Sequence, residues 1–245
     1  MILFLAATLA AAAPAAAAPA AAACPEVITP DALICRAIHA QAAGESTEAA
    51  QAFEQAALAS SEKDPATARM WAAAGNMWIA VGQYGKASLV LDRALALPGL
   101  ESEQRGEALL DRARAAEALN DLKTARAKLA LAAESIADDP FYWYFSAALA
   151  IREGDPATAR SSIGKALTLA PGDAMILFEA GHVAQFAGDD KQARDYWTRA
   201  IAADPAGAVG KAAREAIDLL AAPTPKTQLA PKPQPAPKPH PAPKP

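Results

Sequence analysis

Apolar residues recur along the middle of the chain with the spacing of amphipathic helices, and this helical pattern itself repeats. Four alanines at spacings of 38, 34 and 34 residues hold the same place in the pattern: Ala87, Ala125, Ala159 and Ala193. Four residues after each comes a large apolar residue: Leu91, Leu129, Ile163 and Trp197. Five residues before each stands a glycine or, once, Asn120. A period near 34 residues is typical of an array of helical hairpins, so the pattern predicts a stack of helix pairs.

The stretch from residue 69 to residue 98 shows what one hairpin contains. Trp71, Gly75 and Trp78 fall on one face of a first helix. Gly82 ends that helix, because a residue without Cβ can adopt the left-handed conformation. The buried stripe of the second helix is then Tyr84, Ala87, Leu91 and Ala94, and Pro98 stops it.

This run resembles a tetratricopeptide repeat (TPR), which has large, small, aromatic, Gly, aromatic, Ala, aliphatic, Ala and Pro residues at similar intervals. Five segments between residues 31 and 205 match this pattern in phase, the first and third least well. The resemblance implies an all-α fold, a right-handed α-α superhelix of about five TPR helix hairpins. The alternative is an unrelated bundle of helical hairpins. A further amphipathic helix over 207–220 is predicted to cap the last repeat.

The chain begins with an uncharged segment, residues 1–23, that consists almost wholly of Ala, Leu, Ile and Phe. It has an apolar region followed by small-residue cleavage sites, so it is predicted to be a secretory signal peptide, although no Lys or Arg precedes the apolar run. A disordered Ala/Pro leader is the alternative. Pro14 and Pro19 interrupt the segment, so no integral membrane span is expected. The predicted domains are the signal peptide, a repeat domain with its capping helix over 24–222, and a disordered Pro/Lys-rich polyproline tail over 223–245.

Two cysteines, Cys24 and Cys35, lie at the start of the predicted mature chain. In an exported protein such a pair most simply forms a disulfide. The competing interpretation is a lipoprotein, because residues 21–24 form a loose lipobox that would place a lipid on Cys24 and leave Cys35 without a partner. The predicted location is therefore exported, either periplasmic or secreted, with an outer-membrane lipoprotein as the alternative.

Charge is divided unevenly between the repeat domain and the tail. Residues 24–222 hold 19 Lys and Arg against 27 Asp and Glu, and this acidic balance argues against nucleic acid as a partner. The tail holds no acid and four lysines: Lys226, Lys232, Lys238 and Lys244. Their six-residue spacing is two turns of a polyproline helix, so they would align on one side. The tail is either a passive spacer or a basic rod that contacts an acidic surface such as a cell-wall polymer.

The resemblance also implies where a partner binds, because the first helix of each hairpin lines the concave surface of such arrays. The positions carried over onto this chain give these candidate groove residues: Asn76, Arg114, Phe141, Tyr144, Met175, Phe178 and His182. The aromatic residues and Met175 would form an apolar binding surface, unless they pack against the neighbouring repeat. Asn76 and Arg114 would bond a peptide backbone or a carboxylate. Ile34 and Ile38 stand where chaperone-binding members carry Lys and Asn, so a chaperone-type clamp is not expected.

No pattern of catalytic residues accompanies the repeats. The histidines His39, His182 and His240 are far apart, and the sequence has no phosphate loop or nucleophile elbow. Two cysteines eleven residues apart do not make a zinc site. We therefore expect no enzymatic activity, cofactor or metal, and predict a protein- or peptide-binding scaffold in the cell envelope. The alternatives are a lipid-anchored outer-membrane assembly factor and a cell-wall spacer that acts through its tail.

Overall fold

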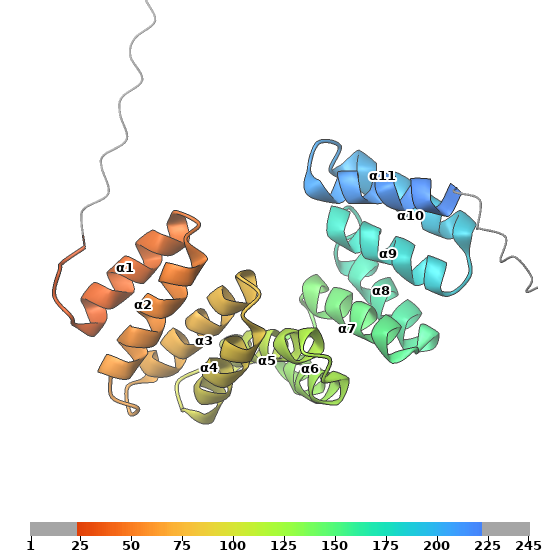
Figure 1. Cartoon of the computed structure of the whole chain (residues 1–245). Helices are drawn as coiled ribbons and strands as arrows, with labels where there is room; N and C mark the ends of the chain where they lie inside the picture. The colour runs from red at the N-terminus through yellow and green to blue at the C-terminus, as the bar shows by residue number, and fades with distance from the viewer. Residues whose placement is uncertain (1–23, 222–245) are drawn as a thin grey trace, which may run out of the picture. The chain divides into compact units, whose positions relative to one another are not determined.

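A computed structural model of the chain describes residues 24–221 (Figure 1). Within this range it contains eleven α-helices and no strand, which confirms the all-α helical-repeat prediction. The predicted signal peptide and tail lie outside the described residues. The chain divides into two compact units between Leu119 and Asn120. None of the described helices is both long and apolar enough to cross a membrane.

The first unit holds five helices joined by short turns. They are α1 (Pro30–Ala42), α2 (Ser46–Ala59), α3 (Pro65–Ala80), α4 (Tyr84–Ala96) and α5 (Ser102–Ala118). Each helix packs on the next one along the chain, and α3 also packs on α5, as the red-to-olive ribbon of Figure 1 shows. This arrangement matches two complete hairpins, α1/α2 and α3/α4, followed by the first helix of a third.

The second unit holds the remaining six helices. They are α6 (Leu122–Ile136), α7 (Pro140–Glu153), α8 (Pro156–Leu169), α9 (Ala174–Phe186), α10 (Asp190–Ala203) and α11 (Ala208–Ala221). Successive helices again pack on one another, α7 packs on α9, and α11 lies against α10 and α9. The helix α11 therefore covers the last hairpin, in the place of the predicted cap.

The third predicted hairpin is divided between the two units, because α5 belongs to the first and α6 to the second. Ion pairs join each of these helices to a neighbour in its own unit. Arg112 on α5 makes two hydrogen bonds, of 3.0 and 3.1 Å, to the carboxylate of Asp92 on α4. Arg126 on α6 binds Glu153 on α7 at 2.5 Å and donates a 3.3 Å hydrogen bond to Ser146.

All five first helices, α1, α3, α5, α7 and α9, are followed within two residues by a residue with positive φ. These residues are Gly44, Gly82, Asn120, Gly154 and Gly188, with φ between 62° and 80°. Glycine suits this left-handed conformation because it has no Cβ, and asparagine tolerates it better than most other residues. The glycine or asparagine five residues before each aligned alanine is thus explained by the turn that it must make.

Aspartates begin many of the helices. The side chains of Asp64, Asp139, Asp155, Asp173 and Asp189 each accept a hydrogen bond from a backbone N–H of the first turn. The hydroxyl and backbone N–H of Thr158 donate to Asp155 and hold the pKa of its carboxyl below the ordinary value. These caps satisfy donors that a helix start leaves without an internal acceptor.

The small and large residues of the repeat meet where the two helices of a hairpin cross. All four aligned alanines are completely buried. A Cβ added to Gly75 on α3 would overlap the side chain of Leu91 on α4. A Cβ added to Gly181 on α9 would overlap the indole of Trp197 on α10, which is itself completely buried. Each glycine therefore leaves the space that a large residue on the partner helix fills.

This complementarity predicts opposite effects for two glycine-to-alanine substitutions in the second unit. Gly181→Ala should lower the free energy of unfolding by about 1–3 kcal/mol, because the added methyl overpacks against Trp197. A Cβ added to Gly164, in α8, would have no heavy atom within 4 Å. Gly164→Ala should therefore raise the free energy of unfolding by about 0.5–1 kcal/mol. Urea denaturation of both variants checks this. Equal effects of the two changes would contradict the packing described here.

Candidate functional site

Five consecutive aromatic residues open α7 and point around the helix. Tyr142 and Phe145 are buried, whereas Phe141, Trp143 and Tyr144 are half-buried. Burial raises the pKa of the Tyr142 phenol, and the positive charge of Arg126 acts in the opposite direction. As the helical period requires, part of the run enters the core and part reaches the surface.

Five of the candidate groove residues lie on α7 and α9, and we refer to this set as the aromatic surface: Phe141, Tyr144, Met175, Phe178 and His182. On α7 the rings of Phe141 and Tyr144 stack with centroids 5.2 Å apart. On α9 the rings of Phe178 and His182 meet edge to face at 4.4 Å, and Met175 remains 41% exposed. Since α7 packs on α9, the second unit holds all five candidate residues on two neighbouring helices.

Some members of the aromatic surface also touch the core of the second unit. Tyr144 and Phe178 each pack one side against buried apolar residues. Trp197 lies edge to face with His182 at 5.7 Å and donates a 3.0 Å hydrogen bond to the carbonyl of Phe178. These side chains therefore combine the two predicted roles: they pack against a neighbouring helix and keep part of their surface accessible.

His182 also lies 3.4 Å from Glu179, a glutamate on the same helix that is almost completely buried. The histidine is thus held on three sides, by Phe178, Trp197 and this carboxylate. These contacts fix the ring beside Phe178 and make His182 part of the framework of the aromatic surface.

The polar candidates Asn76 and Arg114 lie in the first unit and share one carboxylate. Asn76 on α3 donates a 2.8 Å hydrogen bond to Asp111 on α5, and Arg114 donates another of 2.8 Å to the second oxygen of the same carboxylate. Asp111 could not be predicted as a partner of Asn76 from the sequence, because only the packing of α3 on α5 brings the two side chains together. The two donors, expected to bond the peptide backbone or a carboxylate of a partner, therefore each bind a carboxylate of this chain in the structure.

A cavity of 470 Å³ lies between α2, α3 and α4 of the first unit, away from every candidate residue named from the sequence. Its lining comes from these three helices and from the turn between α2 and α3: Ala57, Leu58, Ser60, Glu62, Thr67, Trp71, Arg93, Ala96 and Leu97. The guanidinium of Arg93 lies over the ring of Trp71 at 4.9 Å from its centroid. Periodicity could not reveal this cavity, because its lining comes from two different hairpins.

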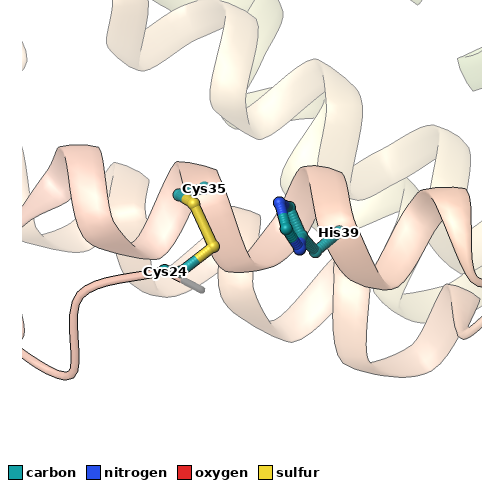
Figure 2. A group of neighbouring side chains, drawn as sticks. All are labelled: Cys24, Cys35 and His39. Carbon is teal, nitrogen blue, oxygen red and sulfur yellow. A yellow bond between two sulfur atoms is a disulfide. The ribbon is translucent and has the colours of Figure 1, made fainter. Parts of the chain in front are cut away.

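The segment that enters α1 is fixed to that helix in two ways. Cys24 and Cys35 form a disulfide, with their Cα atoms 5.8 Å apart (Figure 2). Arg36, also on α1, donates hydrogen bonds to the backbone carbonyls of Pro25 at 2.6 Å and Val27 at 3.1 Å. His39 stands one helical turn beyond Cys35, on the same side as the disulfide (Figure 2).

Comparison with known proteins identifies the fold. No protein-family model and no curated protein matches the chain. Among solved structures, PilW, a widely conserved type IV pilus biogenesis factor, is similar with a TM-score of 0.63 and 18% identity, over 75% of this chain and 81% of that one. MamA from Desulfovibrio magneticus RS-1 is similar with a TM-score of 0.60 and 16% identity, over 72% and 95%. YrrB, a TPR protein with an unusual peptide-binding site, is similar with a TM-score of 0.54 and 21% identity, over 75% and 91%.

The shared carboxylate generates a prediction about the first unit. Asp111→Ala should lower the free energy of unfolding by about 1–2 kcal/mol, because it removes the acceptor of two hydrogen bonds, one of them from a charged group. Asn76→Ala leaves the bond between Asp111 and Arg114 intact and should lower the free energy of unfolding by under about 1 kcal/mol. Chemical denaturation compares the two variants. A larger loss for Asn76→Ala would show that Asp111 does not organise the cluster.

Proposed function

On the premise that this chain has the tetratricopeptide-repeat fold, we propose that it is a non-catalytic scaffold that binds a protein or peptide segment in the cell envelope. The partner lies on the aromatic surface of the second unit. The observation that carries the proposal is the grouping of three half-buried rings, one histidine and an exposed methionine on the neighbouring helices α7 and α9.

The chemistry of the aromatic surface suits an apolar segment of a partner. Partly accessible aromatic rings supply large contact area with little side-chain freedom to lose, and aromatic anchors tend to dominate binding energy. The stacking of Phe141 on Tyr144 and the edge-to-face contact of Phe178 with His182 hold all four rings before a ligand arrives. Met175 adds a flexible apolar group that adapts to different side chains.

The similar structures support the same class of function. YrrB carries a peptide-binding site and PilW takes part in type IV pilus biogenesis. At the identities found here they share the fold alone with this chain, so its partner is proposed from the aromatic surface and not from theirs.

The disulfide supports the proposed export, because such bonds persist in oxidising compartments. The lipid-anchored assembly factor would need Cys24 to carry a lipid in place of this bond. The cell-wall spacer would act through Lys226, Lys232, Lys238 and Lys244, which lie outside the described residues. Both remain alternatives to the periplasmic or secreted scaffold.

Peptide binding to the aromatic surface can be tested with the full chain immobilised against a library of random displayed peptides. Peptides selected on the wild type should contain apolar or aromatic residues. Met175→Glu should reduce the affinity for the best of these peptides at least about tenfold, because it places a charge within the apolar contact. Tyr144→Ala should reduce the affinity by a similar factor, because it removes an aromatic ring from the contact. Isothermal titration calorimetry measures both.

The matched control is Leu89→Glu, which places the same charge on an exposed leucine of α4, in the first unit. It should leave peptide affinity unchanged. Thermal melting of each variant separates a loss of binding from a loss of fold. If Met175→Glu and Leu89→Glu bind the selected peptides equally well while both remain folded, the aromatic surface is not the binding site.

A further inference from the structure

We propose that, when its disulfide is reduced, this protein binds one thiophilic d¹⁰ cation, Zn²⁺ or Cu⁺, through Cys24, Cys35 and His39. The disulfide and the metal site are then two alternative states of the same residues. This inference concerns the first unit and does not depend on peptide binding by the second.

The geometry of these three side chains carries the proposal. Their potential ligand atoms all lie within 4.8 Å of one another, and within residues 24–221 they are the only group of three or more His, Cys, Asp or Glu that meets this condition. Cys35 and His39 are four residues apart on α1, so both project from the same face of the helix (Figure 2). Cys24 reaches this face from the entry segment.

The spacing suits a metal ion without rearrangement of the helix. Zinc binds thiolate sulfur at about 2.3 Å and imidazole nitrogen at about 2.0–2.1 Å in a tetrahedral arrangement. Ligand atoms around such an ion are therefore separated by roughly 3.5–3.8 Å. The two sulfur atoms, which are bonded to each other in the disulfide, must move apart on reduction, whereas the ring nitrogen of His39 already lies within 4.8 Å of both.

The entry segment does not depend on the disulfide alone for its position. Arg36 binds the carbonyls of Pro25 and Val27, on the residues that directly follow Cys24. The Thr29 hydroxyl caps α1 by accepting a 3.4 Å hydrogen bond from Ala32. These contacts keep Cys24 beside α1 after the sulfur–sulfur bond is broken, so the reduced protein retains a partly organised set of ligands.

The redox step is balanced by a dithiol reductant. The reductant supplies two electrons and two protons to the disulfide, which becomes two thiols, and the reductant itself becomes a disulfide. The cation then displaces both thiol protons and bonds to two thiolates and to one nitrogen of neutral His39. Thiolate ligands favour Zn²⁺ and Cu⁺ over harder cations. Three protein ligands complete a trigonal Cu⁺ site, or leave the fourth position of Zn²⁺ to water.

The site could not be predicted from the spacing of the two cysteines, because its third ligand is a histidine. His39 lies fifteen residues after Cys24, a spacing that matches no familiar zinc motif. The fold supplies the missing ligand by returning the entry segment along α1. His39 is exposed and the two cysteines are half-buried, so a cation can reach the site from solvent.

The test uses the full mature chain, reduced with a phosphine that is then removed by gel filtration, and kept free of oxygen throughout. Titration with Co²⁺, a spectroscopic substitute for Zn²⁺, should give a thiolate-to-cobalt charge-transfer band that saturates at one ion per chain and is lost on addition of Zn²⁺. A second titration against a coloured Cu⁺ chelator measures the affinity for Cu⁺. The two titrations identify which cation binds more tightly.

Four comparisons decide the outcome. The oxidised protein and the reduced Cys35→Ser variant should show no charge-transfer band of this kind. His39→Ala should weaken binding at least about tenfold, whereas His182→Ala, which removes a histidine of the second unit, should change nothing. The proposal is overturned if reduced and oxidised protein bind alike, if His39→Ala binds as the wild type does, or if mass spectrometry finds a lipid on Cys24. Circular dichroism confirms that each variant is folded.

Discussion

The close approach of two helices within one hairpin is the contact on which the rest of the structure depends. It requires a small residue on the first helix opposite a large one on the second, as Gly181 faces Trp197 and Gly75 faces Leu91. The aligned alanines, which lie on the second helices, are also completely buried. Because the buried faces are fixed in this way, the remaining faces of the first helices are available for other contacts. The aromatic surface lies on such remaining faces of two first helices, α7 and α9.

The aromatic surface is better understood as an extension of the core than as a separate feature. Tyr144 and Phe178 each have one side against buried residues, and the backbone carbonyl of Phe178 accepts a hydrogen bond from the buried Trp197. Rings that are held in this way lose little freedom when a ligand covers them, which reduces the entropic cost of binding. The same contacts mean that the fold and the proposed function share residues, so a change at Phe178 affects both. The contribution of Met175 to binding can be separated most cleanly from its contribution to folding, because Met175 is the most exposed residue of the aromatic surface.

Features that depend on position within the repeat could be predicted from the sequence. The buried alanines, the left-handed turn at Gly82 and its replacement by Asn120 follow from spacing and from local backbone chemistry. Features that depend on contacts between hairpins could not be predicted. Asn76 comes beside Asp111, and Cys24 comes beside Cys35 and His39, only because folding brings together separate segments of the chain. The division of the third hairpin between two units is likewise not predicted by the period, although the spacing of 38 residues between Ala87 and Ala125 departs from 34 in this region.

The fit between Gly181 and Trp197 also restricts how this sequence can change over evolutionary time. A larger residue at position 181 collides with the indole, and a smaller residue at position 197 leaves a cavity, so neither change is neutral alone. The corresponding positions in the preceding hairpin carry Ala147 and Ile163, which lie in one buried cluster and divide the same space differently. Homologous chains should therefore vary at these two positions in a correlated way, with the combined volume preserved while the individual residues are exchanged. Recombination that separates the two helices of a hairpin would break this correlation, so whole hairpins are the units that can be duplicated or replaced.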